Sequence, residues 1–381
     1  MLTPKYLREQ PDNIASIYLK LENQILSDLS KSMAENIELT GTSEYQLKIL
    51  KEMGYDLKKI EKEIARTTNL SQKEVSKLLR SSSELSYNDD RKRYKEGGKN
   101  LPSLDNNPKM IDFIESVIKQ TNGSMRNLSN GMGFIDRKGF TLLNKYYEDI
   151  LDYAIFQVGS GAYSYQDALY QAVKKLGDSG IRTIDYSSGR AYHIESAARM
   201  NVLTSLNQIT GHMSEANAEM MGQDLMEITA HHGARPTHAD WQGQIVSRNG
   251  KGDYLTLEDI GYETVEGFQG ANCRHGWFPY FEGISKPAYN EETLKEFEGE
   301  NIVFDEKEYT PYEVTQRQRS LERAMRHTQR QLIVYEDAGL KDKAIATKIR
   351  LKGQADLYTE FSNVAGIRPK FDRIGVYRKG D

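Results

Sequence analysis

The chain lacks the sequence features that mark several large classes of protein. A single cysteine in 381 residues excludes an internal disulfide framework and indicates a reducing compartment. The opening residues MLTPKYLREQPDN lack the apolar core of a signal peptide, and no apolar run approaches the roughly 18 residues that span a bilayer. We therefore expect a protein that is made in the cytoplasm and has no membrane partner.

An excess of positive charge is also missing. The formal net charge is −4, so any contact with nucleic acid must be local. Neither a phosphate-binding loop nor a GxGxxG pattern with the required flanks occurs. Charged residues make up 28% of the chain and the mean hydropathy is −0.68, which is typical of an elongated helical protein or one made for assembly.

Helical periodicity dominates what remains. The expected fold class is mainly α with a small α+β module: elongated helical N-terminal and central regions, the compact module, and C-terminal helices. Residues 1–80 form the N-terminal helical region, where apolar residues recur at helical spacing, as in Ile14, Tyr18, Leu21, Ile25 and Leu29.

The next two regions differ in composition. Residues 81–107 are polar and charged, and we predict a long loop or mobile arm there. Asn107 followed by Pro108 is the pattern of a helix cap with proline in the first turn, and it starts a central helical domain over 108–225.

The last three regions begin with a change from helix to mixed structure. Residues 226–290 are predicted to form the α+β module, with a strand at MEITAHH and a hairpin that turns at Asn249-Gly250. Residues 291–310 are predicted to be a solvated acidic linker, because 291–308 hold eight acidic residues and two lysines. Residues 311–381 are predicted to be basic helices and a tail.

The C-terminal helices combine an apolar seam with a basic stripe. The seam residues are spaced 4, 3, 4 and 3 apart, as in a short coiled coil: Leu321, Met325, Thr328, Leu332 and Tyr335. From 317 to 352 there are ten Lys and Arg against four acidic residues. The stripe either contacts DNA phosphates or an acidic partner, or is a solvated face. Its residues are Arg317, Arg319, Arg323, Arg326 and Arg330.

Chemically capable residues gather between 231 and 277. Imidazole and thiolate are ligand types that suit tetrahedral zinc, and Cys273 and His275 alternate onto one face of an extended segment. One interpretation is a structural zinc site, with zinc as the possible cofactor, made by His231, His238, Cys273 and His275. The alternative is that these residues hydrogen-bond and pack around a turn without metal.

Catalytic interpretations of the same segment are weaker. Cys273 beside a histidine would resemble a nucleophile with its base, but no orienting third group is evident. Asp240 near zinc ligands would resemble the base of a metallohydrolase or nuclease. The signature of a zinc deaminase is absent. No catalytic residue is therefore assigned.

Two further features of the segment concern structure. Arg235 lies in Gly-Ala-Arg-Pro between Gly233 and Pro236, so it either points at a partner's carboxylate or phosphate or bonds local carbonyls. Trp241 and Trp277 are predicted to be core aromatics of the module.

Together these residues resemble a known family. HHGARPTHADWQGQ with GANCRHGWFPYFEG is similar to the signature of the phage minor capsid protein 2 family, which is related to the Mu F-like head morphogenesis proteins. The opening LTPKYLREQPDNIASIYLKLENQILSDL and IDYSSGRAYHIESAARMNVL fit the same pattern. The resemblance carries the signature to His231, Gly233, Arg235, Pro236, His238, Trp241, Gln242, Gly243, Asn272, Cys273, Arg274 and His275.

The resemblance implies a structural, non-enzymatic minor virion protein of a tailed bacteriophage. Such a protein is made in the host cytoplasm and enters the capsid interior or portal vertex. The implied partner is the portal protein, with the major capsid or scaffold protein and viral DNA as further candidates. The implied roles are head morphogenesis, DNA packaging or DNA ejection. The competing hypotheses are a metal-dependent hydrolase or nuclease and a DNA-binding packaging factor.

Overall fold

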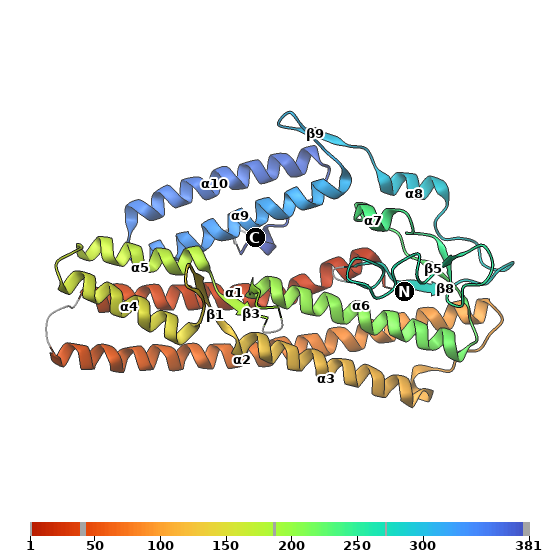
Figure 1. Ribbon diagram of the computed structural model, residues 1–381, viewed down its shortest axis with the longest axis horizontal. Coiled ribbons are helices and arrows are strands. Elements are labelled where there is room, and N and C mark those ends of the chain that lie inside the picture. Colours follow the sequence, from red (N-terminus) through yellow and green to blue (C-terminus); the bar gives the residue numbers. More distant parts are fainter. Residues whose placement is uncertain (1, 39–42, 186–187, 271–272, 376–381) are drawn as a thin grey trace. The chain divides into compact units, whose positions relative to one another are not determined.

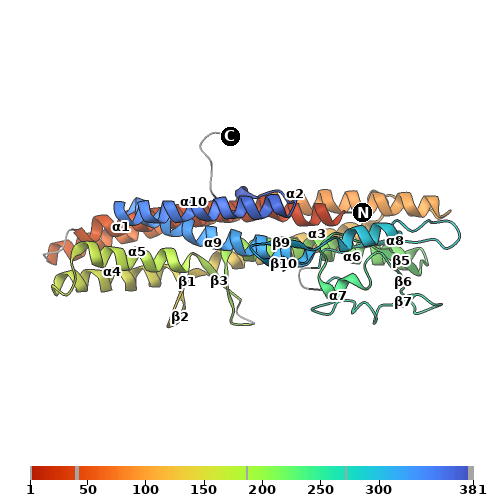
Figure 2. The same ribbon diagram turned by 90° about the horizontal axis from the view of Figure 1, so that it is seen from above.

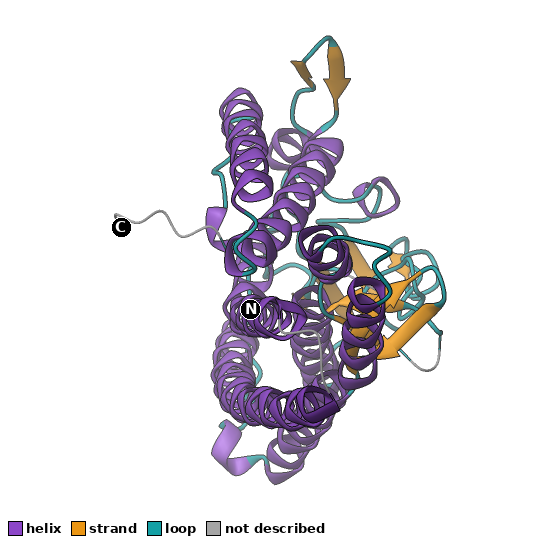
Figure 3. Ribbon diagram, turned by 90° about the vertical axis from the view of Figure 1, so that its left-hand side faces the viewer, coloured by secondary structure: helices purple, strands orange, loops and turns teal. Residues whose placement is uncertain are grey.

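The computed structural model describes residues 2–38, 43–185, 188–270 and 273–375. Helices make up most of the described chain and strands are confined to small sheets, which confirms the predicted fold class (Figure 1 and Figure 3). The long helices are α1 (Pro4–Glu38), α2 (Ser43–Glu96), α3 (Pro108–Asn130), α4 (Leu143–Gly159), α5 (Tyr165–Ser179), α6 (Ile194–Met220), α9 (Pro311–Asp337) and α10 (Lys341–Val364). Among the described residues, no helix is both long and apolar enough to cross a membrane.

The chain folds into two compact units. Unit 1 comprises residues 1–14, 72–124 and 199–317, and unit 2 comprises residues 15–71, 125–198 and 318–381. Five helices have residues in both units: α1, α2, α3, α6 and α9.

Unit 2 combines helices with a four-stranded sheet. The strand order is β2-β1-β3-β4, from β1 (Met132–Asp136), β2 (Gly139–Leu142), β3 (Arg182–Ile184) and β4 (Ala191–His193), all antiparallel (Figure 2). Phe134 of β1 stacks on Tyr146 of α4 at 4.9 Å between ring centroids. The hydroxyl of the fully buried Tyr18 lies 3.0 Å from Ser71 Oγ and 3.3 Å from Ser129 Oγ, which satisfies a polar group inside the helical core.

The predicted loop over 81–107 is wrong for its first part, because α2 continues to Glu96. The buried face keeps the helical spacing but carries small and polar residues instead of leucine: Ser82, Ser83, Ser86, Tyr87, Asp90 and Tyr94. Several of these groups are hydrogen-bonded inside the fold, although the Tyr94 hydroxyl and Asp90 Oδ1 have no partner among the described residues. Asp90, for example, accepts hydrogen bonds from Ser214 Oγ at 2.7 Å and Asn217 Nδ2 at 3.0 Å. The polar composition therefore indicated a loop, although these residues form the buried face of a helix.

The start of α3 follows the prediction. The helix begins at Pro108, and Asn107 Oδ1 accepts a hydrogen bond from the backbone N–H of Met110 at 3.2 Å. Between α2 and α3 lies a short 3-10 turn, η1 (Leu104–Asn106).

The α+β module of unit 1 is built on a second four-stranded sheet. Its order is β7-β6-β5-β8, from β5 (Leu225–Ile228), β6 (Ile245–Ser247), β7 (Leu255–Thr256) and β8 (Trp277–Pro279). The predicted hairpin at Asn249-Gly250 is wrong, because β6 and β7 pair in parallel. The intervening chain loops back, and Gly250 and Gly252 take positive φ angles of 64° and 73° on the way.

The acidic segment over 291–310 forms regular structure, so the prediction of a linker is wrong, whereas its predicted exposure to solvent is confirmed for nearly all of its residues. It contains α8 (Glu291–Glu298) and the hairpin of β9 (Ile302–Phe304) and β10 (Lys307–Tyr309). Asn290 caps α8, since its Oδ1 accepts from Thr293 N at 2.8 Å. Glu291 and Glu292 suit the positive end of the helix dipole, so acidic composition here favours helix.

The C-terminal region is helical as predicted. The five seam residues of α9 are all buried. In the paired helix α10, Tyr358 donates its hydroxyl to Glu322 Oε1 of α9 at 2.9 Å. A 3-10 turn, η2 (Phe371–Arg373), follows α10.

Candidate metal centre

The pairing of β5 with β8 brings two distant parts of the sequence together. Ile228, the last residue of β5, is the register partner of Trp277, the first residue of β8. The backbone N–H of Thr229 continues this ladder by donating to Gly276 O at 2.8 Å. The segment after β5 therefore lies beside the segment that ends in His275.

A single helical turn, α7 (Pro236–Ala239), supplies the second part of the site. Arg235 is its N-cap residue and Pro236 takes the first position, where a missing N–H costs nothing. His238 donates its backbone N–H to Arg235 O at 2.8 Å and accepts from Gln242 N at 3.0 Å. This turn places the His238 ring inside the module, where it is 2% exposed.

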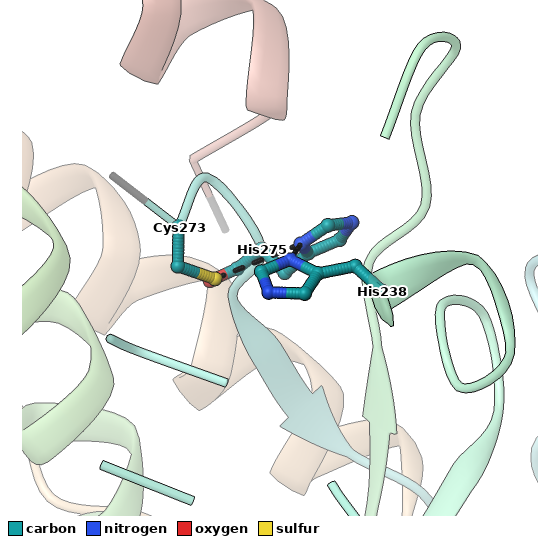
Figure 4. Close-up of side chains that lie close together, drawn as sticks. All are labelled: His238, Cys273 and His275. Atoms are coloured by element: carbon teal, nitrogen blue, oxygen red, sulfur yellow. Dashed lines mark hydrogen bonds between the residues drawn. The ribbon is translucent and has the colours of Figure 1, made fainter. Parts of the chain in front are cut away.

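Three of the four residues predicted to bind zinc converge on one point. His238 Nδ1 lies 3.3 Å from His275 Nδ1, and Cys273 Sγ lies 3.6 Å from the same His275 nitrogen. Figure 4 shows the two rings and the thiol turned toward one another. One ligand atom from each lies within 4.8 Å of the others, and all three residues are buried. We call these three residues the His–Cys cluster.

The outer nitrogen of each ring has a fixed partner. His238 Nε2 donates to the backbone carbonyl of Glu266 at 2.8 Å. His275 Nε2 lies 3.3 Å from Gln242 Oε1, which also accepts the backbone N–H of His231 at 3.1 Å. Because that backbone N–H can only donate, the atom facing both groups is the amide oxygen of Gln242, and His275 Nε2 carries a proton.

Aromatic side chains enclose the cluster. Trp241 packs on His238 at 4.4 Å and on His275 at 4.9 Å between ring centroids. Phe268 contacts both Trp241 and Trp277, at 5.9 and 5.1 Å. Both tryptophans are buried in the core of the module, as predicted, together with Cys273.

The surroundings disfavour charge on the cluster. Burial, followed by the nearby positive charges, holds the pKa of His275 well below its usual range. Burial likewise lowers the pKa of His238 to about 4, partly opposed by its bond to the Glu266 carbonyl. Burial raises the pKa of the Cys273 thiol, against the opposing effect of backbone hydrogen bonds from His275 and Gln269. Both rings are therefore neutral at pH 7.

The fourth predicted ligand, His231, has a different role. Its ring stacks on His275 with centroids 4.5 Å apart, and its Nδ1 lies 3.0 Å from the carbonyl of His232. A carbonyl only accepts, so His231 Nδ1 carries the proton and is not turned to the cluster. The structure thus brings together His238, Cys273 and His275 and leaves His231 as a stacking neighbour.

The two signature glycines occupy positions that need them. Gly233 has a φ of 67° and Gly243 a φ of 72°. A Cβ at Gly243 would also lie 2.7 Å from Leu294 Cδ2 and 3.1 Å from Tyr289 Cβ. These two positions of the motif are therefore set by the backbone conformation, which favours glycine.

The remaining signature residues lie around the cluster. Arg235 and Arg274 are half-buried, and their charges contribute to lowering the pKa of both His238 and His275. Asn272 lies outside the described residues.

The arginines of the basic stripe on α9 differ in how far they are exposed to solvent. Arg330 is 3% exposed and its Nη1 lies 3.6 Å from Glu22 Oε2, so the prediction of a DNA or partner contact is wrong for this residue. Arg326 pairs with Glu195 at 3.3 Å. Arg317 and Arg319 are half-buried, and Arg323 is exposed.

Sequence reasoning missed the buried charge network of unit 2. Glu22 is fully buried, and its Oε1 accepts the backbone N–H of Ile181 at 2.7 Å. It lies with His193 and Glu195 within 4.8 Å, beside the guanidinium of Arg330. One signal was available: Glu22 sits four residues after Tyr18 on the apolar face of α1.

The fold and the site together define a mainly helical protein whose small α+β module encloses a buried His–Cys cluster. The chain belongs to the family described as Phage minor capsid protein 2, whose model matches residues 2–362, and this confirms the family resemblance. It is similar, at 27% identity over 181 residues, to a protein named "Structural protein" of Lactococcus phage LL-H. That match covers 45% of this chain and spans 48% of the relative's length. No solved structure matches the chain.

Proposed function

We propose that the chain is a minor structural protein of a tailed-phage virion that associates with the portal and acts in head morphogenesis, DNA packaging or DNA ejection. The observation that carries this proposal is the family match over residues 2–362, which includes both units. The protein is made in the host cytoplasm and then enters the particle, at the portal vertex or the capsid interior.

Exposed aromatic residues in unit 2 support a role in assembly. Tyr153 and Phe156 of α4 are 53% and 70% exposed, and Tyr163, just after α4, is 47% exposed. Large apolar side chains that remain in water are typical of protein-binding surfaces, where aromatic residues are enriched. We name these three residues the aromatic patch and assign it to contact with the portal.

A hydrolase or nuclease is less well supported. A catalytic metal needs an open position that substrate reaches. The residues of the His–Cys cluster are only 1–2% exposed, while Asp240, the proposed base, is exposed. This arrangement suits a structural centre.

A packaging factor that binds DNA through the basic stripe is also less well supported. Arg326 and Arg330 are engaged with Glu195 and Glu22 inside unit 2. Phosphate would have to displace these carboxylates. A DNA role therefore has to use other positive residues.

Co-expression with the portal protein of the same phage tests the proposal. We expect the wild-type chain to co-purify with portal rings, and Phe156→Ser to lower the recovered fraction at least about tenfold, since an anchor residue contributes roughly 2 kcal/mol. Val265→Ser is the matched control, because Val265 is 74% exposed in unit 1. Absence of the wild-type chain from portal rings and from purified particles, measured by mass spectrometry, would exclude the proposed role.

A further inference from the structure

The inner nitrogens of the His–Cys cluster face each other without a proton between them. Nε2 of each ring faces an acceptor oxygen, the Glu266 carbonyl for His238 and Gln242 Oε1 for His275, and this fixes the tautomer with the proton on Nε2 and the lone pair on Nδ1. His238 Nδ1 and His275 Nδ1 therefore present lone pairs to each other across 3.3 Å. The Cys273 thiol has one proton, which satisfies one of these nitrogens and leaves the other unpaired in a buried site.

The distances match those around a tetrahedral ion. With Zn–N of about 2.05 Å and Zn–S of about 2.3 Å, a tetrahedral zinc separates two nitrogens by about 3.3 Å and a nitrogen from a sulfur by about 3.6 Å. The observed separations are 3.3 Å between the two Nδ1 atoms and 3.6 Å between Cys273 Sγ and His275 Nδ1. Two of the three separations in the cluster therefore fit tetrahedral zinc as they stand. The ligand atoms of His238 and Cys273 lie within 4.8 Å of each other, so a small approach of these two side chains would let one cation contact all three donor atoms.

The hydrogen-bond acceptors beside the two rings are of the kind that hold metal-binding histidines in place. Ligating histidines usually donate the other ring N–H to a carbonyl, which fixes the ring and its tautomer. His238 and His275 both do this, to the Glu266 carbonyl and the Gln242 amide oxygen. Two neutral imidazoles and a thiolate select zinc or a similar transition ion over magnesium or calcium.

We propose that His238, Cys273 and His275 bind one zinc ion that joins α7 to the segment before β8. The ion takes the place of the thiol proton and accepts the lone pairs of the two facing Nδ1 atoms. His238 precedes Cys273 by 35 residues and His275 by 37, so binding closes a long loop of a module with a small core. Water would complete the coordination, because His231 is not among the residues whose ligand atoms lie within 4.8 Å of one another.

Metal analysis of the full chain tests this site. Protein purified without chelator and dialysed against metal-free buffer should hold about one zinc per chain. Cys273→Ser and His275→Ala should weaken zinc binding at least about tenfold. His232→Ala is the matched control, since His232 is exposed and outside the cluster, and it should bind zinc as the wild type does.

Cobalt substitution makes the test independent of variants that fail to fold. The chain has one cysteine, so a thiolate-to-cobalt charge-transfer band in the wild type can arise only from Cys273. We expect this band together with the strong visible absorption of tetrahedral cobalt, and we expect zinc, but not magnesium, to remove both.

Two outcomes would overturn the assignment. Wild-type protein that binds no zinc and shows no charge-transfer band at saturating cobalt would leave the cluster as a hydrogen-bonded packing unit. His231→Ala with the same loss of zinc as His275→Ala would replace the three-ligand set with four protein ligands. Neither result bears on portal association, which is measured separately.

Discussion

At the scale of single residues, Gln242 links the sequence signature to the chemistry of the cluster. Its amide oxygen accepts from both His231 N and His275 Nε2, and this double role sets the tautomer of His275. The spacing of the histidines predicted a shared site, but no sequence pattern showed that His231 would stack on His275 while its Nδ1 faced a backbone carbonyl. Such choices depend on distances that only the folded chain defines.

A substitution of Gln242 separates positioning from packing. Gln242→Leu removes the acceptor that holds His275, and we expect zinc affinity to fall about 10- to 100-fold. Gln242→Glu keeps an acceptor oxygen and should retain affinity within a few-fold. Competition titration against a zinc chelator measures both. Equal losses in the two variants would contradict a role of Gln242 through its accepting oxygen.

Glu22 gives the second prediction at this scale, a pH dependence of stability. Burial, opposed by Arg330, raises the pKa of Glu22 from its ordinary value to about 7, and Glu195 adds to the increase while Arg326 opposes it. The folded state therefore binds a proton that the unfolded state has released between about pH 4.5 and pH 7. The stability contributed by this proton is complete below pH 4.5 and is lost as pH rises to about 7.

We expect Glu22→Gln to remove this part of the pH dependence, worth up to about 3 kcal/mol. Gln resembles the protonated carboxyl that the folded wild type holds below about pH 7, so the loss of the negative charge beside Arg330 destabilises the variant mainly above that pH. Urea unfolding from pH 4.5 to pH 8 measures the slope. A variant whose stability changes with pH as steeply as the wild type would show that Glu22 does not titrate in this range.

At the scale of secondary-structure elements, regular apolar spacing predicted helices well and polar composition predicted loops badly. The apolar spacing predicted helix α1, the Asn107-Pro108 pair marked the start of α3, and the α9 seam is buried. The stretch 81–96 was missed because Ser83 and Asp90 are polar yet buried. Their partners, Leu79 O for Ser83 and Ser214 for Asp90, lie on the same or a distant helix and are invisible to composition.

Glu84 tests whether this stretch is a helix. It is exposed in the interior of α2, so Glu84→Pro would remove a backbone hydrogen bond and introduce a steric clash without disturbing a buried side chain. We expect a loss of about 3 kcal/mol in the free energy of unfolding, measured by denaturant titration. Glu84→Ala is the matched control and should be neutral or slightly stabilising. A neutral proline variant would favour the loop.

At the scale of the whole molecule, the proposed zinc ion should act on one part of the chain. Its ligands lie within 238–275, inside unit 1. We expect chelation to raise hydrogen exchange in the module, around β5, α7 and β8, and to leave the seam of α9 and helix α10 unchanged. Mass-spectrometric hydrogen exchange with and without chelator measures this. A uniform change along the chain, or none, would contradict a local structural metal.

The proposed role in the particle is the central claim, and an asymmetric cryo-electron microscopy reconstruction of the phage tests it most directly. The claim predicts density at the portal vertex that fits the helices and the α+β module of this chain, in few copies. Particles that contain no such density at the portal, or that carry the chain throughout the capsid shell, would contradict it.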